Sequence, residues 1–102
     1  MLVENNASLQ PYNTFGIVAR AQTLVRVRSS DDVHALRAHP QLGTQPWFVL
    51  GGGSNVVLTG DVKPVVLKME IKGRRLVQET EHAWIVEAGA GEPWHDTVAW
   101  TL

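Results

Sequence analysis

Three glycines followed by a serine and an asparagine, Gly51-Gly52-Gly53-Ser54-Asn55, form the segment of this sequence best suited to chemistry. Glycine allows backbone conformations closed to other residues and lets the main chain approach a ligand without an obstructing Cβ. Successive N–H groups in such a turn can point into one concavity that binds phosphate oxygens, to which a hydroxyl and an amide add further donors. The pattern predicts a phosphate-binding loop, and a flexible turn between two strands is the alternative.

The residues after these glycines argue against two common nucleotide motifs. A G-x-G-x-x-G dinucleotide turn needs glycine or alanine where Val56 stands, and a helix directly afterwards. Thr59-Gly60-Asp61 instead predicts a turn, and the Walker lysine is missing. A phosphate bound here would be held by a loop between strands.

Gly89-Ala90-Gly91 is a second candidate, because it stands between an expected strand and an expected helix. This layout presents helix N–H groups to an anion. Glu92 at the same place disfavours an anion, so a tight turn into a packed helix is the favoured alternative.

Asn13 and Thr14 are a third candidate, as polar residues able to touch a ligand. Such a run is more often an Asx-type turn in which Phe15 anchors the segment in the core.

The remaining chemistry-bearing residues predict no site. The sequence has no cysteine, and its four histidines lack short metal-ligand spacing, so we assign no metal ligand. The sequence shows no nucleophile that can be paired with a general base, so no catalytic residue is assigned. The arginines at 20, 26 and 28 are expected to be solvated strand-face charges, and the four tryptophans are expected in the core.

Hydrophobic periodicity predicts the elements that position the first glycine segment. Residues 1–16 read as an irregular lead-in. Residues 23–28 predict a strand, and residues 31–38 a short helix started by hydroxyls and carboxylates. The apolar run 47–50 predicts a short strand buried on both faces, which completes a βαβ unit.

The second half is expected to be an antiparallel meander with strands at 64–71, 75–80 and 83–88. A helix then carries Trp94, Val98 and Leu102 on one stripe. Because the chain stops there on an apolar residue without a capping glycine, we expect the natural polypeptide to continue.

Length and composition limit the classes of protein. The chain has 102 residues, 44% of them apolar, and a net charge of -1. These values indicate one small globular domain or a piece of one, and argue against a nucleic-acid-binding domain. The first residues do not read as a signal peptide, and the sequence shows no apolar run long enough for a membrane span, so we expect a cytoplasmic location and no membrane partner.

Taken together, residues 11–16 (PYNTFG), 49–56 (VLGGGSNV) and 88–92 (AGAGE), the last followed by Trp94-His95, closely resemble the UDP-N-acetylenolpyruvoylglucosamine reductase family. These enzymes are also called UDP-N-acetylmuramate dehydrogenases. The resemblance runs from about Leu9 to the last residue.

The resemblance implies an α+β FAD-binding domain of the vanillyl-alcohol-oxidase type. Residues 1–62 would form a small α/β subdomain, and residues 63–102 the incomplete beginning of a second subdomain with an antiparallel sheet. The cofactor-binding residues implied for FAD are Gly51, Gly52, Gly53, Ser54, Asn55, Asn13, Thr14, Gly89, Ala90 and Gly91.

The activity implied is that of a flavoprotein oxidoreductase of peptidoglycan precursor synthesis, and so of cell-wall biogenesis, cell shape and cell division. NADPH reduces the flavin, which passes hydride to the enolpyruvyl group of a UDP-sugar. The family's proton donor matches no residue here and is expected after position 102, in the remainder of the polypeptide, so the isolated chain is expected to be inactive. The alternatives are another flavoenzyme of the same fold, a non-enzymatic nucleotide- or phosphate-binding module, and a structural piece.

Overall fold

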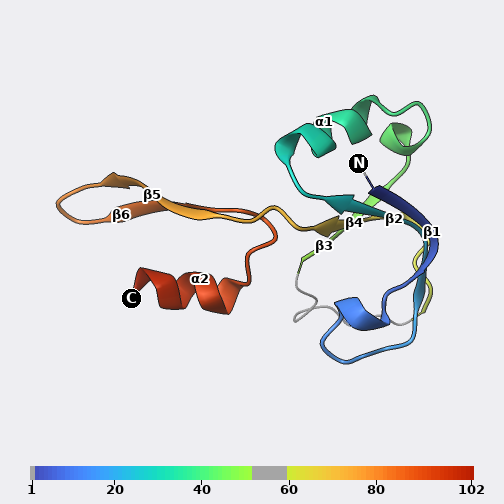
Figure 1. Ribbon diagram of the computed structural model, residues 1–102, viewed down its shortest axis with the longest axis horizontal. Helices are drawn as coiled ribbons and strands as arrows, with labels where there is room; N and C mark the ends of the chain where they lie inside the picture. The colour runs from blue at the N-terminus through green and yellow to red at the C-terminus, as the bar shows by residue number, and fades with distance from the viewer. Residues whose placement is uncertain (1, 52–59) are drawn as a thin grey trace.

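The computed structural model describes residues 2–51 and 60–102 of the 102-residue chain. The molecule is elongated, measuring 49 × 33 × 18 Å, and contains a four-stranded sheet and a separate two-stranded hairpin (Figure 1). The strands are β1 (Leu2–Ser8), β2 (Arg20–Val27), β3 (Trp47–Leu50), β4 (Val65–Met69), β5 (Arg74–Glu79) and β6 (Trp84–Ala88). The helices are α1 (Ser30–Ala38) and α2 (Trp94–Thr101), with short 3-10 turns η1 (Gln10–Tyr12) and η2 (Leu42–Thr44). The predicted α+β class is confirmed.

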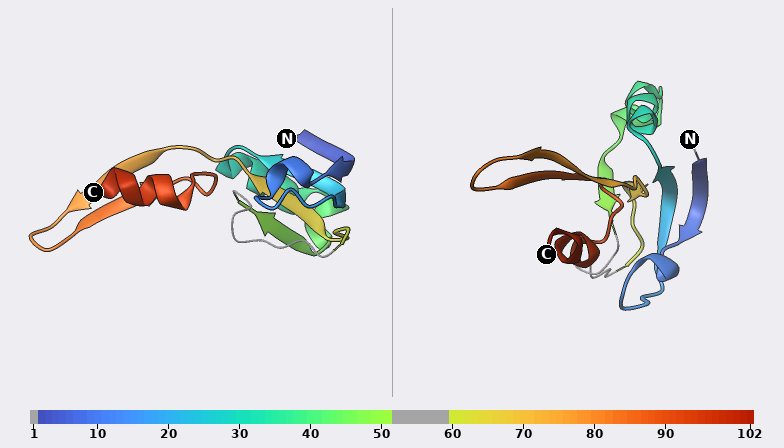
Figure 2. Two further views of the ribbon diagram at one scale, coloured as in Figure 1. Left: turned by 90° about the horizontal axis from the view of Figure 1, so that it is seen from below. Right: turned by 60° about the vertical axis from the view of Figure 1, so that its left-hand side comes forward.

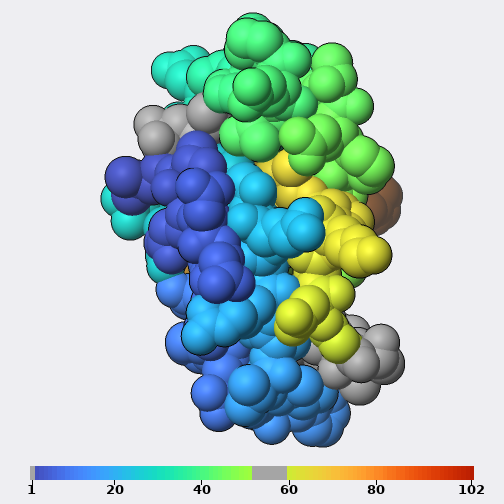
Figure 3. All heavy atoms as spheres, turned by 90° about the vertical axis from the view of Figure 1, so that its right-hand side faces the viewer, coloured from blue at the N-terminus to red at the C-terminus, as the bar shows by residue number. Residues whose placement is uncertain are grey.

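The four-stranded sheet has the order β1-β2-β4-β3. Strands β2, β4 and β3 are parallel to one another, and β1 pairs antiparallel with β2. The predicted βαβ unit is present, because α1 connects β2 to β3 and β4 fills the place between them. Seen from the side away from the hairpin, the residues that follow position 59 lie next to β2 (Figure 3), where Val62 bridges to Ala21.

Alternation along β2 and β4 supplies both faces of the sheet with apolar side chains, which is why the sheet has two core clusters. One cluster, beneath α1, contains Val25, Val27, Leu36, Leu42, Val65 and Leu67. The other, beneath residues 9–19, contains Ala7, Leu9, Ala19, Ala21, Leu24, Leu50 and Val66.

Helix α1 begins where the sequence predicts it, for the predicted reason. The hydroxyl of Ser29 accepts a hydrogen bond from the backbone N–H of Asp32 at 3.2 Å. Asp31 and Asp32 lie in the first turn, where the helix dipole favours carboxylates. Leu36 is fully buried and fastens the helix to the sheet.

Residues 1–16 were expected to be irregular, and this prediction is wrong for the first half of the segment. Residues 2–8 form β1, because the edge of β2 offers them a complete antiparallel partner. Asn6 adopts a left-handed φ of 52° within the strand, a conformation that asparagine tolerates better than most residues. Tertiary pairing thus overrides a local sequence rich in turn formers.

The expected three-stranded meander is also wrong, since β4 joins the first sheet in parallel and only β5 and β6 form an antiparallel pair. Residues on both sides of position 63 therefore share one sheet. Strand β3 is not buried on both faces: it lies at the edge of the described sheet, and Val49 is 60% exposed.

The β5–β6 hairpin projects from the sheet, and α2 runs beside it (Figures 1 and 2). Both elements match the predicted ranges closely, but their tryptophans are not in a core. Trp84, Trp94 and Trp100 are exposed, whereas Trp47 packs against the cluster beneath α1. Neither described helix has the length and apolarity needed to traverse a membrane.

Candidate functional site

The first glycine segment begins at the carboxyl end of β3. Gly51 directly follows Leu50, and the adjacent parallel strand β4 ends at the same edge of the sheet. Ligands of open α/β sheets bind outside the carboxyl ends of the strands. The remaining predicted loop residues, Gly52 to Asn55, lie outside the described residues.

A charged cluster stands beside Gly51 on one face of the sheet. The ammonium of Lys68 donates a hydrogen bond of 2.9 Å to the Gly51 carbonyl. Arg26, its register partner on β2, forms ion pairs of 2.9 Å with both Glu4 and Glu70. We name this the Tyr12 cluster, after the aromatic ring at its centre; its members are Glu4, Tyr12, Arg26, Arg28, Lys68 and Glu70.

The Tyr12 cluster shifts the ionisation of its own members. Burial favours the neutral form of Glu70, but hydrogen bonds from Arg28 and Arg26 outweigh burial, so the pKa of Glu70 is lowered. Burial lowers the pKa of Lys68, and the nearby Glu70 carboxylate opposes this. Hydrogen bonds to Glu4 and Tyr12 raise the pKa of Arg26. The cluster contains three cations and two carboxylates, so it places a net positive charge beside Gly51.

Asn13 is buried and fully used in holding its own loop. Its amide Nδ2 donates to the carbonyls of Leu9 at 2.8 Å and Ile17 at 3.2 Å, and its Oδ1 accepts from the Ile17 N–H at 2.9 Å. The side chain therefore closes the loop on itself. The neighbouring Thr14 is exposed. Phe15, the expected core anchor, is 64% exposed, so that expectation is wrong and Asn13 anchors the loop instead.

The second glycine segment packs directly on the strand connection at 69–73. The N–H of Gly89 donates to Gly73 O, and the N–H of Gly91 donates to Ile71 O, both at 2.8 Å. A Cβ at Gly89 would lie 2.3 Å from Ile71 O, and one at Gly91 would lie 2.7 Å from Met69 O. Close backbone approach therefore explains both glycines without a ligand.

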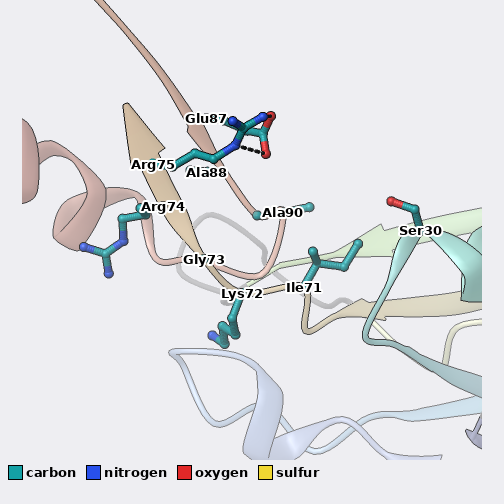
Figure 4. Close-up of a pocket in the computed structure, with 10 residues that line it drawn as sticks. Ser30, Ile71, Lys72, Gly73, Arg74, Arg75, Glu87, Ala88 and Ala90 are labelled. Carbon is teal, nitrogen blue, oxygen red and sulfur yellow. Dashed lines mark hydrogen bonds and ion pairs between the residues drawn. The ribbon is translucent and has the colours of Figure 1, made fainter. Parts of the chain in front are cut away.

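A cavity of about 470 Å³ lies between this turn, the start of β5 and Ser30 of α1 (Figure 4). Three cations line it, but their side chains point in different directions. Lys72 donates to Gly91 O at 2.7 Å, Arg74 to Asp96 O at 3.1 Å, and Arg75 pairs with Glu87 at 3.0 Å. Because each cation is engaged within the chain, the cavity offers no convergent anion site in the described residues.

Glu92, expected to repel an anion at this turn, is turned toward β5. Its Oε2 lies 3.5 Å from Nε of Arg74, and the carboxylate is almost fully buried. The pair ties the start of α2 to the hairpin.

Comparison with known proteins decides the family. A model of the family described as "FAD binding domain" matches residues 21–101, about four-fifths of the chain. The chain belongs to the FAD-binding domain family.

Two curated relatives of this FAD-binding domain carry the same name. The chain is 57% identical to the UDP-N-acetylenolpyruvoylglucosamine reductase of Azoarcus sp. (strain BH72), across 100% of the chain and 30% of that relative. It is 53% identical to the protein of that name from Burkholderia vietnamiensis, across 92% of the chain and 27% of the relative. The chain thus spans less than a third of the length of these relatives.

The net charge beside Gly51 is compatible with the diphosphate of FAD, the ligand named in the description of this family. A diphosphate carries negative charge, which the excess cation of the Tyr12 cluster complements. A Cβ at Gly51 would meet no described atom within 4 Å. As in the cavity beside Ala90, each cation of the Tyr12 cluster is engaged within the chain.

Sequence reasoning missed the Tyr12 cluster. Arg26 was expected to be solvated, but its side chain is only 17% exposed. Positions 26, 68 and 70 share a face of the sheet only because β4 pairs in parallel with β2. The alternation within each strand was visible in the sequence, whereas this pairing was not.

Proposed function

We propose that this chain forms part of the FAD site of a reductase that uses NADPH to convert UDP-N-acetylglucosamine enolpyruvate to UDP-N-acetylmuramate. Such a reaction supplies peptidoglycan precursors. The observation that carries the proposal is the 57% identity, over the whole chain, to a relative named UDP-N-acetylenolpyruvoylglucosamine reductase. The match of residues 21–101 to the FAD-binding family supports the cofactor.

In this proposal the glycine segment binds the FAD diphosphate through its backbone N–H groups. Gly51, Gly52 and Gly53 leave room for the phosphates, and Ser54 and Asn55 add polar donors. The position of Gly51 at the carboxyl end of β3 and the cations beside it support this assignment.

The other assigned residues have more indirect parts. Asn13 shapes the loop that presents the exposed Thr14 to the cofactor, since the Asn13 amide is engaged within that loop. Gly89, Ala90 and Gly91 hold the second turn close to the end of β4.

The subdomain division remains part of the proposal. Residues 1–62 would belong to the first subdomain of a vanillyl-alcohol-oxidase-type fold and residues 63–102 to the second, with FAD between them. The separation of the four-stranded sheet from the hairpin and α2 supports two units, but it lies after β4, which belongs to the first sheet, and not at position 62 (Figure 1).

When bound, the flavin supplies hydride transfer between NADPH and the enolpyruvyl double bond. The chain's own contribution is to bind and orient the cofactor, and we assign it no catalytic residue. The proton donor and the groups that polarise the substrate carboxylate are expected elsewhere in the complete product of the gene.

The test is the visible spectrum of the complete gene product loaded with FAD. A flavin spectrum that bleaches with NADPH and returns when the enolpyruvyl UDP-sugar is added under anaerobic conditions supports the reductase. Recovery only with dioxygen favours another flavoenzyme of the fold. A protein that stays colourless but binds UDP or ADP would point to a nucleotide-binding module and overturn the proposal.

A further inference from the structure

Lys68 lies on β4 beside the carboxyl end of β3, where the glycine segment begins. In the parallel β3–β4 pair, Lys68 is the register partner of Leu50, the residue before Gly51. Its side chain lies on the same face as Val66, two residues earlier, because side chains of a strand alternate. From there its ammonium reaches the Gly51 carbonyl at 2.9 Å. The contact joins two residues seventeen positions apart.

The ring of Tyr12 covers two cations from neighbouring strands. Arg26 Cζ lies 5.1 Å from the ring centroid and Lys68 Nζ lies 5.9 Å from it. Arg26 also donates to the phenol oxygen of Tyr12. Cations at these distances are attracted by the ring. Tyr12 therefore holds both side chains at the carboxyl edge of the sheet.

Holding the charged ammonium of Lys68 in its partly buried position costs free energy, so its contact with Gly51 indicates a specific role for the side chain. The side chain is partly buried, and burial disfavours its charged form. Arg26 beside it repels the ammonium, and Glu70 attracts it. An unconstrained lysine side chain would extend its ammonium into water. In this structure the ammonium stays at the carbonyl that opens the glycine segment.

We propose that Lys68 is a positioning residue of the cofactor site, whose ammonium fixes the Gly51 carbonyl at the carboxyl end of β3. Because this carbonyl is held before the cofactor arrives, it does not have to be ordered on binding.

The same cluster aligns the two segments that the proposed function assigns to FAD. Tyr12 directly precedes Asn13 and Thr14, and Arg26 holds its phenol. Lys68, under the same ring, holds Gly51. The inference rests on the proposed function, since it assigns a role within that site.

The experiment is a titration of FAD into the complete gene product, followed by flavin fluorescence. The variants are K68M, which keeps the apolar stem, and K68R, which keeps a cationic donor. K63M is the matched control, because Lys63 is exposed on the segment leading to β4. Melting temperatures of the cofactor-free proteins are measured alongside. We expect K68M to raise the Kd for FAD about tenfold, the order of a lost charge-assisted hydrogen bond. K68R should restore most of the affinity, and K63M should bind like the wild type.

The outcomes separate this inference from the proposed function. If the wild type binds FAD and K68M binds it equally well, the positioning role is refuted while the function stands. The same holds if K68M only lowers the melting temperature, which indicates a structural residue. If the wild type binds no FAD, the function itself falls.

A salt series distinguishes positioning from direct phosphate contact. Weakening of FAD binding by salt reports charges that touch phosphate. Positioning predicts parallel salt dependences for wild type and K68M. A flatter dependence in K68M would place the ammonium on the phosphate and contradict the inference.

Discussion

Replacing Asn13 with alanine tests whether this residue acts on the fold or on the cofactor. The substitution removes three hydrogen bonds that close residues 9–17 into a loop. At about 1 kcal/mol for each bond, the loss of stability should be about 3 kcal/mol. The N–H of Ile17 is left without the Asn13 acceptor, whereas the carbonyl of Leu9 still accepts from the N–H of Tyr12 at 3.0 Å.

The assay is urea unfolding of the cofactor-free complete gene product, with amide hydrogen exchange over residues 9–19 as a local readout. Gln10→Ala serves as the control, because Gln10 is an exposed residue of the same loop. The control should change stability by less than about 0.5 kcal/mol. A similarly small change for Asn13→Ala, together with weaker FAD binding, would refute the loop-anchoring role and assign the amide to the cofactor.

Two further predictions concern the second turn and the charged cluster. Gly89→Ala should destabilise the protein by about 1–3 kcal/mol in thermal melts, because the new Cβ would lie 2.3 Å from Ile71 O. Gly60→Ala is the control and should be nearly neutral, because its Cβ would meet no described atom within 4 Å. The lowered pKa of Glu70 means that its carboxylate stabilises the fold above the ordinary glutamate range and loses that contribution as pH falls through the lowered value. Melting temperatures of Glu70→Gln and wild type should therefore differ at pH 7 and converge as the pH falls through the lowered pKa of Glu70. A difference that stays constant with pH would contradict the role of the charge.

Local patterns in the sequence were sufficient to predict most of the elements. A few neighbouring residues are enough to specify each of three features: the alternation of β2, the capped start of α1 at Ser29, and the turn between β5 and β6. Each of these features is short-range, so propensity and capping chemistry determine it.

Pairing partners were not predictable in the same way. The parallel position of β4 between β2 and β3 depends on contacts between residues about forty positions apart. The strand at Leu2–Ser8 forms because the edge of β2 is available, although Asn5 and Asn6 favour a turn. The Tyr12 cluster depends on both pairings and was therefore invisible in the sequence.

The candidate site likewise contains features that the local sequence predicts and features that depend on strand pairing. The sequence indicated Gly51 as the start of a phosphate loop, and the structure adds the cations beside it. It also indicated Gly89 and Gly91, for which backbone contacts with residues 69–73 supply a structural reason. Glycine spacing shows where the backbone needs room, but not whether a ligand or another strand fills that room.

The central claim is that the glycine segment binds the FAD diphosphate. It is tested most directly by titrating FAD into the complete gene product as wild type, Gly52→Val and Gly60→Val. The account predicts that wild type and Gly60→Val bind FAD alike, and that Gly52→Val binds at least about tenfold more weakly because its side chain occupies the room that the phosphates need. Equal binding by all three proteins, or no binding by any of them, would contradict it.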